Sequence, residues 1–408
     1  MKQKLLSLFG RMGLILFGVI VGLVILEVMF RFMYPDPSPK LINQGLQFDE
    51  TYGLAFTPNV EGWNTSLRGE YSTYIKINGK GLRGQEYEYA KADDTYRILV
   101  LGDSFTAALQ IPEAETFPKL LETQLQQQFP QTKFEVINGG VVGYGTDNEL
   151  AYFTHEGYRY QPDLVVLAFF VGNDITDNIR YSLYKLENGH LVSVKAPRRE
   201  NIGVPPWRQE GSIFRNTRNF LYTNSRLYSV SIELLTLSAI QKIPPVASLL
   251  ISMGFVEITQ PTVNIGNIYA LHHVPAEAWT MTEVLISQLN QEIEADGSQL
   301  LVVILPDESE VDEEKHKKIV ESQTALQEEQ AVTKFQPTVQ LADILEQQGI
   351  LYLQLLPALQ DYQNKTGESL YYKFDGHWVP AGHHVASQAI VDYMIRNQDK
   401  LNNFPGSE

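Results

Sequence analysis

From Tyr96 onwards the sequence alternates between short apolar runs and longer amphipathic segments, and this rhythm constrains the fold more than any other feature. The apolar runs are typical of strands buried on both faces of a sheet. We expect strands at Arg97–Leu101, Phe134–Asn138, Leu164–Phe170, Gln299–Leu305 and Ile350–Leu355. We expect helices at Thr116–Phe129, Thr146–Gly157, Ala276–Asp296, Thr338–Gln348 and Ala381–Arg396. Alternating units of this kind predict an α/β fold, with a mostly parallel five-stranded sheet between two layers of helices.

The N-terminal segment is apolar enough to cross a membrane. Residues Met12 to Phe30, as a helix, would be roughly 28 Å long, which is about the thickness of a bilayer core. Lys2, Lys4 and Arg11 precede the segment, and this favours a cytoplasmic N-terminus with the rest of the chain exported. No small-x-small cleavage site follows it. We therefore expect an uncleaved signal anchor rather than a secretory peptide, with the main domain on the exoplasmic, periplasmic side.

Glu27 is the one acidic residue within this apolar segment. A carboxyl near the end of a membrane helix can reach the polar boundary or stay protonated, and this is the simpler interpretation. Contact with a partner helix is the alternative.

The residues between the anchor and the α/β domain have a different character. Pro35–Lys40 is typical of a stiff, extended linker. A small β-rich preface follows, in which Tyr71–Ile77 is expected as a strand and Asn78-Gly79 as a hairpin turn. The predicted boundaries are 1–34 for the anchor, 35–95 for linker and preface, 96–398 for the α/β domain, and 399–408 for a C-terminal tail.

The alternation is interrupted by an insertion over residues 175–274. Because it leaves from the carboxyl end of the third strand, we expect it to form a lid over that edge of the sheet. Its apolar run, Val246–Phe255, is too short to span a bilayer, so we expect it in a core, with contact to a lipid surface as the alternative. The insertion also carries arginines that would suit an acidic glycan: Arg198, Arg199, Arg208, Arg215, Arg218 and Arg226.

Composition excludes several classes of function. The formal net charge of −16 argues against a nucleic-acid partner, which needs a basic face. The chain has no Cys, so disulfides, thiolate chemistry and cysteine–zinc sites are excluded. The adjacent pairs His272-His273 and His383-His384 do not have the spacing of a zinc-binding helix. Asp307–Glu314 lacks the pattern of a calcium loop and is expected as a solvated loop. No metal and no cofactor is predicted.

Four polar stretches fall where predicted strands end or where the last helix begins. They are Gly102–Thr106, Asn138–Tyr144, Gly172–Asp174 and Asp375–Trp378. Ligands bind at the carboxyl edge of open α/β sheets. Together the stretches supply a hydroxyl, an imidazole, a carboxylate and hydrogen-bond donors, which are the groups that acyl transfer through a serine requires. Each stretch alone is equally typical of an ordinary strand-end turn.

In their order and placement these stretches resemble the SGNH (GDSL-like) hydrolase family, from the first predicted strand to the last helix. The resemblance implies a flavodoxin-like α/β/α sandwich that needs no cofactor. It implies that Ser104 is the nucleophile, His377 the general base and Asp375 the carboxylate that orients the imidazole. The implied oxyanion hole consists of the backbone N–H groups of Ser104 and Gly143 and the side-chain amide of Asn173.

The chain departs from the family pattern in two places. Gly-Asp-Ser is followed by Phe105 instead of leucine, which is a change at a packing position. The usual Asp-x-x-His becomes Asp-x-His, with Phe374 three residues before His377. The shorter spacing resembles the membrane-linked branch that modifies exopolysaccharides, the alginate O-acetylation proteins and their relatives. A Ser–His dyad is the alternative if Asp375 does not reach the ring.

The sequence therefore predicts a serine esterase that acts on O-acyl esters, chiefly acetyl esters, of cell-surface or exported glycans. An O-acyltransferase that uses the same triad is an open alternative, and so is a non-catalytic glycan-binding or assembly protein on the same fold. The expected partners are an acylated carbohydrate or other ester substrate, and a membrane through the N-terminal helix. No protein partner is indicated.

Overall fold

The computed structural model describes residues 2–33, 45–66, 69–180, 182–195, 213–231, 276–315, 317 and 337–406. The chain divides into two compact units, Met1–Lys40 with Glu200–Thr259, and Leu41–Arg199 with Gln260–Glu408. The predicted domain boundaries stay a prediction. Several predicted features lie outside the described residues: Pro35–Lys40, Arg198, Arg199, Arg208, Val246–Phe255 and His272-His273.

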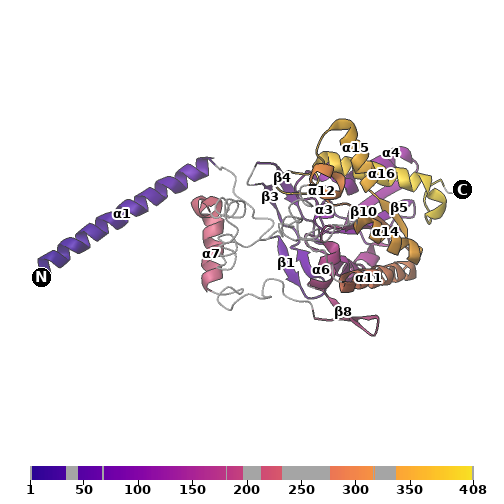
Figure 1. The fold of residues 1–408 in the computed structure, drawn as a ribbon, viewed down its shortest axis with the longest axis horizontal. Coiled ribbons are helices and arrows are strands. Elements are labelled where there is room, and N and C mark those ends of the chain that lie inside the picture. Colours follow the sequence, from indigo (N-terminus) through magenta and orange to yellow (C-terminus); the bar gives the residue numbers. More distant parts are fainter. Residues whose placement is uncertain are drawn as a thin grey trace. The chain divides into compact units, whose positions relative to one another are not determined.

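A parallel sheet forms the centre of the larger unit (Figure 1). Its strands are β5 (Thr95–Gly102), β6 (Lys133–Asn138), β7 (Leu164–Phe170), β10 (Gln299–Leu305) and β11 (Leu351–Gln354). Their order in the sheet is β11-β10-β7-β5-β6, and all neighbours are parallel. In chain order this is the doubly wound, flavodoxin-like arrangement, with its switch point between β5 and β7. The predicted fold class is confirmed.

Helices cover both faces of this sheet (Figure 1). The helices are α3 (Ser104–Ala107), α4 (Phe117–Gln128), α5 (Thr146–His155), α6 (Asp174–Arg180), α11 (Ala276–Ala295), α12 (Glu308–Val311), α14 (Pro337–Gln348), α15 (Leu356–Thr366) and α16 (Pro380–Arg396). Short 3₁₀ turns occur at η1 (Glu113–Glu115), η2 (Gly157–Tyr160) and η5 (Gln398–Lys400). Successive side chains of a strand point to opposite faces. Ile98 and Val100 accordingly pack in the same core as α4 and α16, whereas Leu99 and Leu101 pack with α5 and α11.

The start of α5 differs from the prediction. Thr146 followed three residues later by Glu149 has the sequence pattern of a capping box, but the residue that caps the helix is Gly145. The side chain of Asn148 accepts a hydrogen bond from the Gly145 N–H at 3.0 Å, and the Thr146 N–H donates to Asn178 at 2.8 Å. The capping-box prediction is wrong because the helix begins at Thr146, one residue earlier than a box with Thr146 as its cap requires. This leaves Glu149 inside the protein.

The acidic stretch Asp307–Glu314 also differs from the prediction of a solvated loop. It contains helix α12, and Asp307 and Glu308 are only 3% and 5% exposed. Asp307 caps this helix by accepting the Ser309 N–H at 2.9 Å, and Glu310 accepts the Thr338 hydroxyl at 2.9 Å. The solvated-loop prediction is wrong for the first part of the stretch, where residues 307–309 are buried, whereas Glu313 and Glu314 are exposed.

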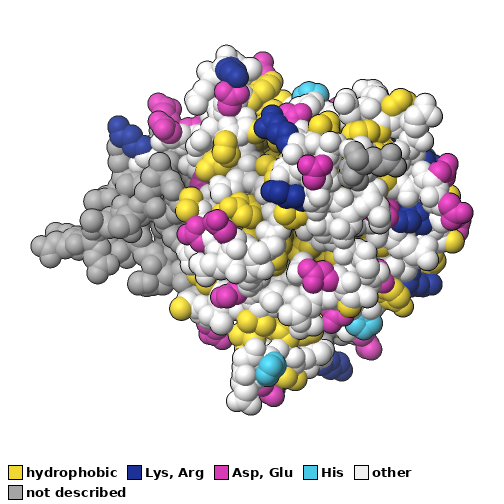
Figure 2. All heavy atoms as spheres, turned by 90° about the vertical axis from the view of Figure 1, so that its right-hand side faces the viewer, with side chains coloured by type: hydrophobic (Ala, Val, Ile, Leu, Met, Phe, Trp, Pro, Cys, Tyr) yellow, Lys and Arg dark blue, Asp and Glu magenta, His cyan; other side chains and the backbone are white. Residues whose placement is uncertain are grey.

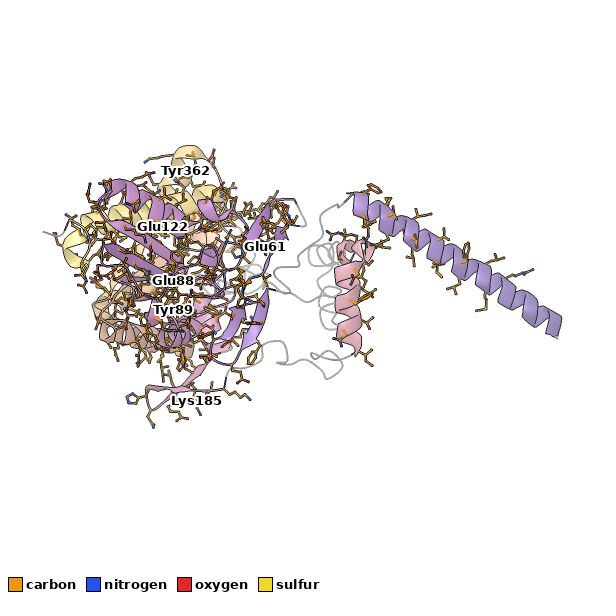
Figure 3. All side chains as sticks on the ribbon, turned by 180° about the vertical axis from the view of Figure 1, so that it is seen from behind. Glu61, Glu88, Tyr89, Glu122, Lys185 and Tyr362 are labelled. Carbon is orange, nitrogen blue, oxygen red and sulfur yellow. The ribbon has the colours of Figure 1, made fainter. Side chains whose placement is uncertain are left out.

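The predicted β-rich preface consists of two antiparallel pairs, β1 (Leu46–Asp49) with β2 (Gly53–Phe56) and β3 (Glu61–Thr65) with β4 (Ser72–Lys76). We call the second pair the β3–β4 ribbon, including its connecting residues Gly69–Tyr71; Glu61 marks it in Figure 3. The turn predicted at Asn78-Gly79 is wider than a two-residue hairpin, because Asn78 accepts the N–H groups of Lys80 and Leu82 and the chain reverses between Ile77 and Arg83.

The last residues of the chain are packed against the body. Phe404 is 1% exposed and its ring contacts those of Tyr96, Phe129 and Phe134. Leu401 is also buried. The described part of the segment predicted as a tail, residues 399–406, is therefore attached to the α/β domain.

A third antiparallel pair follows helix α6 in the insertion. It consists of β8 (Tyr184–Glu187) and β9 (His190–Ser193) and projects from the body, with Lys185 marking it in Figure 3. On the face shown in Figure 2, acidic and basic side chains are interspersed, and the described residues form no continuous basic patch there.

The smaller unit contains the predicted apolar helix. Helix α1 (Lys2–Met33) includes the stretch Arg11–Met33, whose mean hydropathy is 2.7 and whose apolar residues are not buried by the rest of the described chain. Length and composition make this stretch long and apolar enough to cross a membrane.

Glu27 is tied to a segment of the insertion just beyond helix α7 (Ile213–Asn224). Its carboxylate accepts the Ser225 hydroxyl at 2.8 Å and the backbone N–H groups of Arg226 at 2.9 Å and Leu227 at 3.0 Å. Arg31 donates both to Glu27 and to the Asn224 carbonyl, each at 2.8 Å. Glu27 thus contacts another segment of the same chain, and its role in a membrane stays a prediction.

Candidate active site

Ser104 lies directly after the central strand β5, at the first residue of helix α3. Asp103 caps this short helix by accepting the Phe105 N–H at 2.9 Å. The loop after the neighbouring strand β6 packs closely on α3. Only a glycine fits at position 140, since a Cβ there would lie 2.4 Å from the backbone nitrogen of Ala107. Asn138 strengthens this contact by donating to the Thr106 carbonyl at 2.8 Å. The hydroxyl of Ser104 is therefore held at the carboxyl edge of the sheet.

Asp375 and His377 lie in a tight loop that precedes α16. The Tyr372 N–H donates to the His377 carbonyl at 2.8 Å and the Gly376 N–H to the Tyr372 carbonyl at 3.0 Å. Gly376 has a φ of +82°, a conformation that residues with a Cβ rarely adopt. This turn directs the two flanking side chains toward each other despite the short Asp-x-His spacing.

A continuous chain of hydrogen bonds joins the three side chains. His377 Nε2 lies 2.8 Å from Ser104 Oγ, and His377 Nδ1 lies 2.7 Å from Asp375 Oδ1. In this geometry the ring can accept the proton of the hydroxyl while its other nitrogen donates to the carboxylate. Asp375 therefore reaches the imidazole ring, and the contacts are those of three side chains rather than of a Ser–His dyad.

Aromatic rings fix the position of the imidazole. The Phe105 ring lies 4.8 Å from the His377 ring and 4.1 Å from Phe170. Trp378, which is fully buried, contacts Phe105 edge-on at 5.2 Å. The phenylalanine that replaces the family's leucine thus forms part of the surface on which the imidazole rests.

The charges around His377 determine its protonation. Burial alone would lower the pKa of His377, but the hydrogen bond and negative charge of Asp375, with the charge of Asp103, raise it above the usual value. Burial would raise the pKa of Asp375, yet hydrogen bonds from His377 and Tyr71 lower it. The carboxylate is therefore ionised when the imidazole gains a proton, which is the arrangement that stabilises an imidazolium.

The candidate oxyanion donors follow neighbouring strands. Ser104, Gly143 and Asn173 come after β5, β6 and β7, so all three lie at the same edge of the parallel sheet. Gly143 has a φ of +79°, in a turn closed by the Tyr144 N–H donating to the Val141 carbonyl.

Asn173 is half-buried, and its side-chain amide donates to Asp177 Oδ2 at 3.0 Å. The amide also has a hydrogen bond to Asp103, which lowers the pKa of that acid. The amide is thus already engaged with carboxylates next to the site.

Three buried carboxyl groups lie beneath Ser104. Asp103 accepts the Phe105 N–H and Asp174 accepts the Phe170 N–H at 2.8 Å, so both hold the backbone next to the strand ends. Burial raises the pKa of Asp103 to about 6 and those of Asp174 and Glu149 well above their usual values. Both oxygens of Glu149 lack a hydrogen-bond partner among the described residues.

We predict that Glu149→Gln stabilises the protein more at pH 7 than at pH 5. The pKa of Glu149 is higher in the folded than in the unfolded chain. At a pH above the pKa of the unfolded chain, folding therefore requires the uptake of a proton. The free energy of unfolding falls as the pH rises from the pKa of the unfolded chain toward that of the folded chain. Glutamine removes this penalty, which grows by up to ~1.4 kcal/mol per pH unit. Thermal unfolding of both proteins at several pH values measures the difference. The matched control is Glu346→Gln, at an exposed position on α14. Parallel stability curves for wild type and Glu149→Gln would contradict the prediction.

The remaining histidine candidates lie outside the hydrogen-bond chain. His383 is buried beneath the site, stacked on Phe117 and accepting its N–H at 3.3 Å, and burial lowers its pKa to about 3. His384 is exposed on α16. Among the described residues no group of acidic or histidine side chains has the arrangement of a metal site.

Sequence reasoning missed Glu70 and Tyr71, which contact the loop of Asp375 from the preface. Glu70 and Tyr71 precede Asp375 by 305 and 304 positions, and no short motif marks them. It also missed Arg83, which is buried and donates to the Ala107 carbonyl at the end of helix α3 at 2.7 Å and to the Ile111 carbonyl at 2.5 Å.

Comparison with known proteins finds a family similarity in the C-terminal part of the chain. Residues 269–408 match the family model described as "SGNH hydrolase-like domain, acetyltransferase AlgX". The matched part contains Asp375 and His377 and excludes Ser104. This finding confirms the resemblance that the sequence motifs predicted.

Individual relatives are esterases by name. An arylesterase of Vibrio mimicus is 31% identical over 127 residues, which are 29% of this chain and 60% of that protein. The chain thus spans about three fifths of the length of this relative. Among solved structures, LAE5, an alpha/beta hydrolase from the metagenome of Lake Arreo, has 12% identity, a TM-score of 0.38 and coverage of 74% of this chain and 96% of its own. A catalytic mutant of Axe2, an acetylxylan esterase from Geobacillus stearothermophilus, has 11% identity, a TM-score of 0.37 and coverage of 75% and 95%.

Proposed function

We propose that this chain, which carries an SGNH hydrolase-like domain, is a serine esterase that removes acyl groups, chiefly acetyl groups, from cell-surface or exported glycans. The observation that carries the proposal is the hydrogen-bond chain from Ser104 through His377 to Asp375 at the carboxyl edge of the sheet. The direct test is hydrolysis of p-nitrophenyl acetate by the full chain and by its Ser104→Ala variant. Equal rates would favour the non-catalytic glycan-binding alternative.

In the proposed reaction Ser104 Oγ attacks the ester carbonyl while His377 Nε2 accepts the hydroxyl proton. The oxyanion is stabilised by the backbone N–H groups of Ser104 and Gly143 and by the amide of Asn173. The tetrahedral intermediate collapses, the bond to the leaving alcohol breaks, and His377 returns the proton to the alkoxide. Asp375 stabilises the imidazolium between these steps. Water, activated by the same imidazole, then releases the acid from the acyl-serine.

Transfer to a sugar hydroxyl is the second candidate, and the match to an acetyltransferase family model favours it. The two reactions share the acyl-serine intermediate and differ only in the group that attacks it. An activated acetyl ester offered together with an acceptor oligosaccharide distinguishes them, because transfer adds an acetyl mass to the oligosaccharide and hydrolysis releases only acetate.

Helix α1 supports attachment to a membrane. We propose that residues 1–34 cross the bilayer once, with the N-terminus in the cytoplasm and the catalytic domain on the periplasmic side, because basic residues precede the apolar stretch. This location would give the site access to exported polysaccharide.

Two exposed aromatic side chains support a carbohydrate substrate. Trp63 and Tyr74 are paired across the β3–β4 ribbon, are 44% and 41% exposed, and have ring centroids 5.4 Å apart. The other face of the ribbon holds the loop after α3, since Asn64 donates to the Leu109 carbonyl at 2.7 Å. Exposed rings of this kind, carried by an element that contacts the site, offer flat apolar surface to a sugar ring.

We predict that Trp63→Ala raises the KM for an acetylated oligosaccharide by about 3- to 10-fold, which corresponds to the loss of one aromatic contact. The kinetics with p-nitrophenyl acetate should not change, because this small ester does not extend to the ribbon. The matched control is Tyr158→Ala, an exposed aromatic residue at 43% on η2, before β7 and so at the opposite edge of the sheet. An equal effect of the two substitutions, or none from Trp63→Ala, would remove the ribbon from the substrate site.

A further inference from the structure

The carboxylate of Asp375 has two partners, and the proposed mechanism uses only one. Asp375 Oδ1 faces His377 Nδ1 at 2.7 Å, and Oδ2 accepts the hydroxyl of Tyr71 at 2.8 Å. The Asp375 side chain is 6% exposed, so water has little access to it. Burial, and then the charge of Asp375, raise the pKa of Tyr71. The phenol therefore keeps its proton and acts as a donor to the carboxylate.

The neighbouring residue of the ribbon holds the backbone of the same loop. Glu70 Oε1 accepts the Phe374 N–H at 3.1 Å, and its Oε2 accepts the Asp375 N–H at 3.2 Å. The Tyr71 ring also packs on Tyr372 at 5.2 Å. The tip of the β3–β4 ribbon thus contacts the Asp375 loop through side chain, ring and backbone.

The same ribbon also holds the nucleophile side of the site. Asn64 donates to the Leu109 carbonyl and Thr73 to the Gln110 carbonyl, both at 2.7 Å. These carbonyls belong to the loop that follows α3, the helix that begins with Ser104. One preface element therefore contacts both halves of the site, which are far apart in the chain.

We propose that Tyr71 is a positioning residue of the catalytic triad: its hydroxyl fixes the carboxylate of Asp375 so that Oδ1 faces His377. The proposal rests on the proposed function of this site. The torsion that rotates a carboxylate about its own bond is broad, so a single hydrogen bond to the imidazole leaves the group free to turn. A second donor on Oδ2 removes that freedom, and Glu70 holds the backbone from which the carboxylate extends. The hydrogen bond from Tyr71 also stabilises the negative charge of Asp375 and so weakens the effect of that charge on His377.

The test is Tyr71→Phe in the full chain, with p-nitrophenyl acetate as substrate. The hydrogen bond from Tyr71 stabilises the negative charge of Asp375, so its loss makes the carboxylate more basic and leaves more negative charge next to the imidazolium, even when the carboxylate is less well oriented. The pKa of His377 therefore rises, and the acid limb of the kcat/KM profile moves to higher pH. From the usual strength of one hydrogen bond we expect a shift of about 0.5–1 pH unit. We also expect kcat to fall about 10-fold at neutral pH with little change in KM, because the imidazole is less often correctly oriented.

The matched control is Tyr87→Phe. Tyr87 is a buried tyrosine of the preface that donates to the Val136 carbonyl at 3.1 Å and has no contact with the triad. Its loss should lower the Tm without moving the pH profile. A fall of kcat in Tyr71→Phe with an unmoved pH profile would make Tyr71 merely structural and overturn the proposal.

A readout that needs no turnover separates this proposal from the proposed function. The proton between His377 Nδ1 and Asp375 is expected to give a downfield ¹H NMR resonance, identified by its loss in His377→Gln. In Tyr71→Phe this resonance should titrate at higher pH than in the wild type. If the resonance shifts but turnover does not depend on Ser104, the result supports the positioning role of Tyr71 and contradicts the esterase function. Identical titrations would reject the positioning role even in an active enzyme.

Discussion

Replacing Ser104 with alanine is expected to slow hydrolysis of p-nitrophenyl acetate by about 10³–10⁶-fold. The hydroxyl lies 2.8 Å from His377 Nε2, so the substitution removes both the nucleophile and the group whose proton the imidazole accepts. Residual turnover should remain above the rate in water, because the oxyanion donors and the bound substrate are still present. The measurement is kcat/KM for wild type and variant at the pH optimum of the wild type.

The control for this experiment is Ser287→Ala, a serine on α11 that belongs to the helical layer away from the triad. It should retain wild-type kinetics, and both variants should retain the wild-type Tm. Mass spectrometry of the wild type mixed with substrate should find an acetyl group on the peptide that contains Ser104, and none in Ser104→Ala. If wild type and Ser104→Ala turn over at the same rate and no adduct forms, the chain is a binding or assembly protein on this fold.

The sheet could be predicted because its signal is local. Each central strand is a continuous apolar run, and β5 and β7 are buried along their whole length. Ser104, Gly143 and Asn173 could be placed together for the same reason, since each follows a strand of one parallel sheet. The missed helix α15 also had local signals, a proline near its start and Gly367 at φ +71° after its end, but it begins at Leu356, directly after the strand expected at Ile350–Leu355.

Other features could not be predicted because they depend on contacts between distant parts of the chain. Nothing near Tyr71 indicates that its hydroxyl meets Asp375, 304 positions later. The burial of Asp307 likewise depends on elements that pack around α12. The acidic composition of the stretch alone therefore predicted a solvated loop. The short Asp-x-His spacing is explained by one conformation, the positive φ of Gly376, which the residue type permits but does not require.

Replacing Asn173 with alanine is expected to lower kcat by about 10²–10³-fold with a small change in KM, the usual effect of losing one oxyanion donor. The amide now donates to Asp177 Oδ2 at 3.0 Å and has a hydrogen bond to Asp103. An oxyanion role therefore requires one of its N–H groups to turn from a carboxylate to the substrate as negative charge develops on the carbonyl oxygen. Steady-state kinetics with p-nitrophenyl acetate measure the loss, and the Tm shows whether folding is intact.

The same contacts allow a second interpretation, in which Asn173 only holds Asp177 and Asp103 in place. Asp177→Ala distinguishes the two, because it removes the carboxylate and leaves the amide. If Asn173 is an oxyanion donor, Asp177→Ala should reduce kcat far less than Asn173→Ala does, since the donor remains and only its orientation is loosened. Equal losses in the two variants would assign Asn173 to the support of the buried carboxylates. An unchanged kcat in Asn173→Ala would remove it from the site altogether, leaving the backbone N–H groups of Ser104 and Gly143 to stabilise the oxyanion.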